Sequence, residues 1–303
     1  MRSTTPLWQI WSGLICLICL WQCSSPKNSS KNTEGNAVHP NFPYTLDTPD
    51  DEYVLPDILN EISGITYIRE GLLACVQDEL GIVYIYDAKA RKITHEYLFG
   101  KEGDYEGIAK VDTVLYIARS DGKLFRLRGF KSKKLKVAEF NTALSKKNDI
   151  EGLCYDANNH RLLLACKGKP HLKKKKYKHS RAIYAFDLHT HQLEKEPFAI
   201  IDIEEIQKMT GNKKDKFAPS GIVLHPQTQE IYLLSHQGKK IVILSPDGKQ
   251  IKGIIPIHPE KIRQPEGICF SPNLTLYLST EASFSQPEIQ RFENKLRPNS
   301  KEK

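Results

Sequence analysis

The stretch KEGDYEGIAKVDTVLYIARSDGKLFRL, residues 101–127, joins an acidic turn to three short β-rich runs. The turn ends in Glu106-Gly107, a pair that we call a knuckle, and related knuckles occur in NEISGITYI, NDIEGLCYD, APSGIVLHP and QPEGICFSP. The five knuckle glycines are Gly64, Gly107, Gly152, Gly221 and Gly267. Apart from the longer interval before Gly221, they recur about every 45 residues, a period typical of four-stranded propeller blades.

The runs between the knuckles have the length and composition of strands. In the second unit GIAKV, TVLYIA, KLFRL and KVAEF follow one another across short turns, and the fourth unit repeats this plan. The sequence therefore predicts an all-β fold, a five-bladed β-propeller. A β-sandwich would not repeat a glycine knuckle at this period, and a doubly wound α/β fold needs more helices than the sequence indicates.

The long third interval contains two extra features. One is the lysine-rich loop at 167–181, and the other is the segment 202–216, where Ile203, Ile206 and Met209 have helical spacing before Gly211. We expect a short helix there. A sixth, degenerate blade inside this interval stays open as an alternative.

The fifth unit lacks its fourth strand. After GICFS, TLYLS and EIQRF the chain continues into the polar tail at 293–303. We expect residues 41–56 to supply the missing strand, because closing the ring in this way removes exposed sheet edges. The predicted propeller domain spans 41–292.

The N-terminus has the pattern of an export signal. Residues 1–22 contain one cation and an apolar run too short to argue for a lasting transmembrane span. Cys23 resembles the lipid-modified cysteine of bacterial lipoproteins, and 23–40 is typical of a flexible stalk. We expect an exported protein of the bacterial cell envelope, held to the membrane through Cys23. Simple cleavage or a retained anchor are the alternatives.

Cysteine usage and charge limit the class of partner. Four cysteines (Cys75, Cys154, Cys166 and Cys269) lie in strand-like contexts, which favours buried free thiols over required disulfides. The formal net charge is +8, with much of the excess in the loop at 167–181. Since no nucleic-acid-binding motif accompanies this loop, we interpret it as a solvated insertion and expect a monomer.

The knuckles predict a site at one end of the central channel. The first strand of a blade lines the axis, so the side chains before the knuckle glycines should meet there. Three are glutamates whose charges would repel one another. Oxygen ligands favour Ca²⁺, and the predicted ligands are Glu106, Glu151, Glu266 and Glu61. In the alternative, these carboxylates cap backbone N–H groups of the turns.

The second strand of each blade returns to the same end. The residues that follow it form a candidate ligand rim, for which a polar small molecule or an unknown protein is the expected partner. In the alternative they are ordinary polar loop residues. The residues after the second strands are Gln77, Asp78, Arg119, Asp121, Lys167, His236 and Glu281. The rim candidates among them are Arg119, Lys167, His236 and Glu281.

The motifs EISGITY, DYEGIA, DIEGLCYD, PSGI and PEGI resemble the SdiA-regulated family of exported bacterial propellers, which are distantly similar to NHL-repeat proteins. The resemblance covers residues 50–292. It implies a five-bladed propeller with a calcium site and no established enzymatic activity. Ser220, in place of an acid, and the basic insertion depart from the family pattern and affect the expected ligand set.

Two functions follow as hypotheses. The first is a non-enzymatic, envelope-tethered binding or scaffold propeller in which calcium organises one end of the channel. The alternative is a calcium-dependent hydrolase, lactonase-like or phosphoesterase-like, in which Ca²⁺ beside His236, Arg119 and Lys167 polarises an oxyanion. A nucleic-acid binder rests only on the lysine run.

Overall fold

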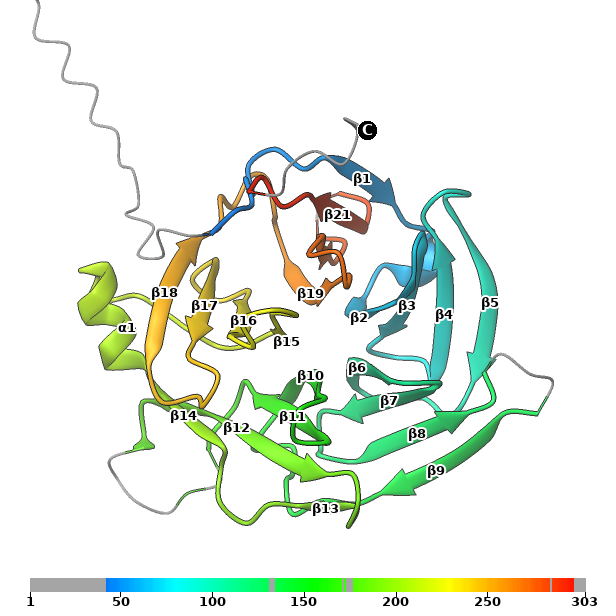
Figure 1. The fold of residues 1–303 in the computed structure, drawn as a ribbon, viewed down its shortest axis with the longest axis horizontal. Coiled ribbons are helices and arrows are strands. Elements are labelled where there is room, and N and C mark those ends of the chain that lie inside the picture. Colours follow the sequence, from blue (N-terminus) through cyan, green and yellow to red (C-terminus); the bar gives the residue numbers. More distant parts are fainter. Residues whose placement is uncertain (1–41, 131–133, 171, 173–176, 284, 297–303) are drawn as a thin grey trace, which may run out of the picture. The chain divides into compact units, whose positions relative to one another are not determined.

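The computed structural model describes residues 42–130, 134–170, 172, 177–283 and 285–296. Their strands form five antiparallel sheets around a central axis, as predicted for a five-bladed β-propeller (Figure 1). The expected signal peptide and stalk, with Cys23, lie outside the described residues, as do parts of the lysine-rich loop and of the C-terminal tail. Within the described ranges no helix is long and apolar enough to cross a membrane.

Each blade places its first strand nearest the axis (Figure 1). Blade 1 contains β2 (Ile62–Arg69), β3 (Leu72–Gln77), β4 (Ile82–Asp87) and β5 (Lys92–Leu98). Blade 2 contains β6 (Tyr105–Val111), β7 (Val114–Arg119), β8 (Leu124–Arg128) and β9 (Lys136–Phe140). The four runs read from the second unit of the sequence thus correspond to the four strands of blade 2.

Blade 3 carries additional elements. It contains β10 (Ile150–Asp156), β11 (Arg161–Cys166), β12 (Ser180–Asp187), β13 (Gln192–Leu193) and β14 (Ala199–Asp202). Both β13 and β14 pair with β12, so the extra residues extend one sheet. The described residues form no sixth sheet, which rules against the six-bladed alternative.

The predicted helix follows blade 3. Helix α1 (Ile203–Thr210) begins after Asp202, whose carboxylate accepts a hydrogen bond from the Glu204 N–H at 2.9 Å. It ends at Gly211, which has a φ of 68° in the left-handed region that glycine adopts readily. Ile206 is buried and packs in the same cluster as Phe217.

Blades 4 and 5 complete the ring. Blade 4 contains β15 (Gly221–Leu224), β16 (Ile231–Ser235), β17 (Lys240–Leu244) and β18 (Ile251–Pro256). Blade 5 contains β19 (Pro265–Phe270), β20 (Leu276–Thr280) and β21 (Glu288–Phe292), joined at its edge by β1 (Asp51–Val54). A short 3₁₀ turn, η1 (Asp57–Leu59), then leads into blade 1. The prediction that residues 41–56 supply the missing strand is therefore confirmed.

The core lies between neighbouring blades. Strands β16 and β17 are buried along their whole length, and Leu233 of β16 shares a cluster with Leu163 of β11. This two-sided burial explains why their sequences are apolar at successive positions rather than alternating. The four cysteines of the propeller are buried free thiols: Cys75, Cys154, Cys166 and Cys269.

The knuckle glycines are required by close packing of the first strands. A methyl group added at Gly107 would lie 2.8 Å from the Leu153 nitrogen of blade 3, and one added at Gly152 would lie 2.9 Å from the Ile222 nitrogen of blade 4. The other three knuckle glycines approach the following blade in the same way, and the fifth approaches the first. Because backbone atoms are among the nearest neighbours, moving a side chain aside would not relieve the contact.

This contact predicts a difference between two alanine substitutions. We expect Gly107→Ala to lower the free energy of unfolding by at least about 2 kcal/mol, because overpacked sites without room to relax cost this much. We expect Gly211→Ala to cost about 1 kcal/mol, because space is open there and only the left-handed backbone is strained. Urea unfolding of both variants measures the two losses in free energy of unfolding. A larger loss for Gly211→Ala than for Gly107→Ala would contradict the packing argument.

Candidate functional site

A β-bulge aims the residue before each knuckle glycine. In four blades the pairing of the first strand with the second skips one residue, for example between Tyr105 and Gly107. A bulge re-aims the side chain that it leaves unpaired. The skipped residues are Ser63, Glu106, Glu151 and Glu266. Together with Ser220 they line one narrow space at the axis, so the knuckles meet as expected from the sequence.

The two serines connect blades. Ser63 Oγ donates a hydrogen bond of 2.6 Å to the Tyr105 carbonyl, and Ser220 Oγ donates one of 2.7 Å to the Pro265 carbonyl. Each accepting residue directly precedes a knuckle glutamate in the next blade. Ser220 therefore holds the strand that carries Glu266, a role that the sequence analysis missed. The sequence does carry a signal for this role: in both cases a serine knuckle is followed by a glutamate knuckle in the next blade.

Glu151 is compensated by a lysine of the predicted rim. Lys167 follows β11, and its Nζ lies 2.9 Å from Glu151 Oε1. Burial raises the pKa of Glu151 to about 8, although Lys167 acts in the opposite direction. Burial alone would lower the pKa of Lys167, but the nearby Glu151 and Glu266 carboxylates raise it above its usual range.

Glu266 has a histidine partner from the neighbouring blade. His236 follows β16 of blade 4, and its Nδ1 lies 2.9 Å from Glu266 Oε1 of blade 5. The contact bridges two blades at the channel mouth. Two of the three axial glutamates therefore each have one basic partner from the predicted rim.

Glu106 keeps its proton. Burial, the proximity of Glu151 and a hydrogen bond with the Asp104 carboxyl raise the pKa of Glu106 to about 11. Asp104 also accepts a hydrogen bond from the Ser120 hydroxyl. The repulsion expected among the knuckle glutamates is thus relieved here by a proton on Glu106, by Lys167 and by His236.

A second carboxyl pair lies between blades 5 and 1. Burial and a hydrogen bond with the Glu61 carboxyl raise the pKa of Glu281 to about 8, and Gln264 donates a hydrogen bond to Glu281. Asp78 lies near both pairs. Burial and the carboxylates of Glu61, Glu79 and Asp104 raise the pKa of Asp78 to about 6. Asp78 Oδ1 is buried and has no hydrogen-bond partner among the described residues.

These residues form an acidic arc at the channel mouth. We use this name for Glu61, Asp78, Asp104, Glu106 and Glu281. Arg119 does not neutralise it, because its guanidinium binds Asp121 in its own turn at 3.0 and 2.7 Å. Of the four rim candidates, Lys167 and His236 thus contact axial glutamates, Glu281 belongs to the arc, and Arg119 faces its own turn.

The donor chemistry of the arc suits a hard cation. It offers only carboxyl oxygens, the ligands that Ca²⁺ prefers, and one of them, Asp78 Oδ1, has no hydrogen-bond partner in the described part of the chain. As arranged, however, the described residues contain no group of three or more His, Cys, Asp or Glu side chains around a point where a metal ion would fit. A cation would therefore have to replace shared protons and draw the carboxylates together.

Comparison with known proteins supports the fold and the family. The model of the SdiA-regulated family matches residues 36–284. None of the curated proteins compared with the chain matches it.

Among solved structures, the glutaminyl cyclase of Myxococcus xanthus is similar at 13% identity, covering 81% of this chain and 95% of that one with a TM-score of 0.56. Virginiamycin B lyase from Staphylococcus aureus is similar at 16% identity, covering 80% and 69% with a TM-score of 0.44. At 13% identity the likeness to the cyclase concerns the fold alone.

The raised pKa values predict how stability depends on pH in the absence of metal. Glu281 holds its proton up to about pH 8 and Glu106 holds its proton up to about pH 11 when folded, whereas the ordinary pKa of glutamate is 4.5. The folded state therefore binds more protons in this interval, and the free energy of unfolding falls as pH rises from about 4.5 to about 8. Melting temperatures measured in EDTA should decline across this range.

A Glu281→Gln variant tests whether the raised pKa of Glu281 contributes to this pH dependence. It removes one of these titrations, so we expect its melting temperature to decline less steeply with pH than that of the wild type. The exposed Glu96 on β5 offers a matched control, because Glu96→Gln should keep the wild-type slope. Equal slopes for wild type and Glu281→Gln would contradict the raised pKa of Glu281.

Proposed function

We propose that this chain, which belongs to the SdiA-regulated family, is a non-enzymatic binding propeller of the bacterial envelope that takes up Ca²⁺ at the acidic arc. The observation that carries the proposal is the buried Asp78 Oδ1, which has no hydrogen-bond partner among the described residues and lies near two hydrogen-bonded carboxyl pairs. A buried polar atom without a partner is costly, and paired carboxyls need a proton or a cation between them. Near neutral pH a calcium ion would supply that charge.

The proposed ion is bound by the acidic arc rather than by all three knuckle glutamates. Glu106 and Glu61 stay among the proposed ligands, joined by Asp78, Asp104 and Glu281. Glu151 and Glu266 already have partners in Lys167 and His236. These two pairs would hold the neighbouring blades in register beside the ion and would define one wall of the mouth.

Binding is favoured over catalysis by the state of the basic side chains. The histidine, lysine and arginine on which hydrolysis would depend are all engaged, with His236 on Glu266, Lys167 on Glu151 and Arg119 on Asp121. The calcium-dependent hydrolase, lactonase-like or phosphoesterase-like, stays the competing hypothesis. Turnover of lactone or phosphate-ester substrates that requires calcium and is lost in a His236→Gln variant would favour it.

Calcium should stabilise the chain from residue 24 on, which contains every described residue. A ligand that binds only the folded state at 100 times its Kd adds about 2.7 kcal/mol, which corresponds to roughly 5–10 °C in melting temperature for a domain of this size. We expect the wild type to melt higher in millimolar Ca²⁺ than in EDTA. The increase should be larger at pH 8 than at pH 5, because the ligands must lose protons.

Two variants define the site. Asp78→Asn combined with Glu281→Gln should lose most of the increase, whereas Glu96→Gln should keep it. An increase that survives the double variant would place calcium elsewhere. The absence of any increase in the wild type would refute the calcium proposal.

The tether is proposed from residues outside the described ranges. We propose that Cys23 is lipid-modified and holds the mature chain at a membrane surface. In a bacterial host fed labelled palmitate, we expect the full chain to carry label and to sediment with membranes. Cys23→Ala should lose both properties and Cys19→Ala should keep them, while labelling of Cys23→Ala at the wild-type level would overturn the assignment.

A further inference from the structure

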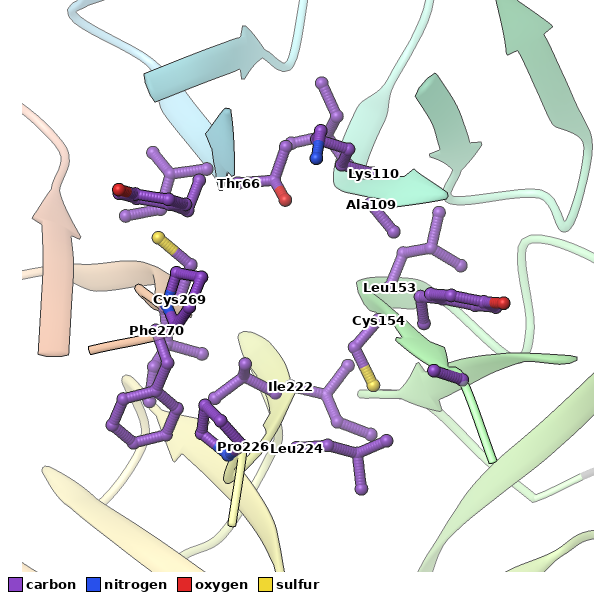
Figure 2. A pocket seen from close by; sticks show the side chains of 18 residues that line it. Thr66, Ala109, Lys110, Leu153, Cys154, Ile222, Leu224, Pro226, Cys269 and Phe270 are labelled. Carbon is purple, nitrogen blue, oxygen red and sulfur yellow. The ribbon is translucent and has the colours of Figure 1, made fainter. Parts of the chain in front are cut away.

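A cavity of about 390 Å³ opens at the end of the channel opposite the acidic arc. Its wall comes from the first strands of all five blades, at positions that follow the knuckle glycines (Figure 2). Thr66, Ala109, Leu153, Ile222 and Phe270 represent the five blades among the residues that line it. We call this cavity the apolar cup.

The cup is separated from the acidic arc by a ring of branched aliphatic side chains. These residues directly follow the knuckle glycines and line both the cup and the narrow space between the knuckles. They are Ile65, Ile108, Leu153, Ile222 and Ile268. The cup therefore narrows at its inner end, where the space between the knuckles has a volume of only about 10 Å³, and such a concave shape suits a small molecule.

A single charge faces this apolar wall. Lys110 of β6 is the only charged residue among the described residues that line the cup. It is half-buried and makes no salt bridge within the described part of the chain. Figure 2 shows it at the cup beside Ala109 and Thr66, whose hydroxyl is a second polar group there. An unpaired ammonium beside an apolar surface favours a ligand with a complementary anion.

We propose that the apolar cup binds a small, mainly apolar molecule with one anionic group, held by Lys110. The aromatic side chains Tyr67, Tyr155 and Phe270 line the cup and suit a flat or aliphatic body. The volume lies within the range of small-ligand sites and is too small for a folded partner. This site is independent of the calcium proposal, because the aliphatic ring separates the two ends.

Anilinonaphthalene sulfonate is a suitable probe, because it has an apolar ring system with one anionic group and fluoresces in apolar surroundings. We expect the chain from residue 24 on to bind one molecule, and octanoate to displace it. Phenylnaphthylamine has similar rings without the charge. Lys110→Met should weaken binding of the sulfonate roughly fivefold, as expected for a half-exposed charge pair, and leave phenylnaphthylamine nearly unchanged.

A variant that blocks the mouth of the apolar cup tests whether both probes bind there. Ala157 is exposed and lines the mouth of the cup, so Ala157→Trp should fill the opening without disturbing the core. It should abolish binding of both probes while the melting temperature stays at the wild-type value. The proposal is overturned if the wild type binds no sulfonate, if Ala157→Trp binds it as well as the wild type, or if Lys110→Met weakens both probes equally.

Discussion

The close approach of five backbones at the axis is the constraint on which the rest of the structure depends. Each first strand passes so near the next that a single added methyl group would contact backbone atoms of the following blade. Glycine is therefore needed once per blade, and this need gives the sequence its period. In four of the five blades a bulge beside the glycine turns the preceding side chain toward the axis, so the same strands that close the ring also gather carboxyl groups at its mouth.

Charge at that mouth is balanced locally rather than by one common partner. Lys167 pairs with Glu151 and His236 contacts Glu266, whereas Glu106 and Glu281 rely on protons shared with neighbouring carboxyls. The blade-to-blade serine bonds keep these side chains at fixed positions. The outcome is a mouth with paired groups on one side and an acidic arc on the other.

The sequence predicted the fold well because its signals are local and repeated. The glycine period, the short apolar runs and the unpaired third strand of the last unit together specified five blades and the contribution of β1. The helix after blade 3 was predictable from its apolar spacing and Gly211. The candidate site was predictable only as a group of residues, because the order of the blades places the knuckles and the rim at one end.

Individual partners could not be predicted, because they depend on how neighbouring blades are staggered. Lys167 contacts the glutamate of its own blade, whereas His236 contacts that of the next blade, although both follow second strands. The hydrogen bond of Ser220 likewise depends on the position of the backbone of blade 5. The apolar cup was missed because its wall consists of core-like strand residues, whose sequence does not distinguish a cavity from packed interior.

The closure of blade 5 by β1 has a mechanical consequence. The N-terminal segment reaches the ring through Tyr44, whose hydroxyl donates to the Leu274 carbonyl at 2.7 Å, and then through the four residues of β1 paired with β21. Tension applied at the N-terminus is therefore borne first by the packing of Phe42 and Tyr44 against blades 4 and 5 and then by the hydrogen bonds of one short strand. The seam that completes the ring is also its weakest link under force, and its rupture would leave β21 as a free edge able to pair with another chain.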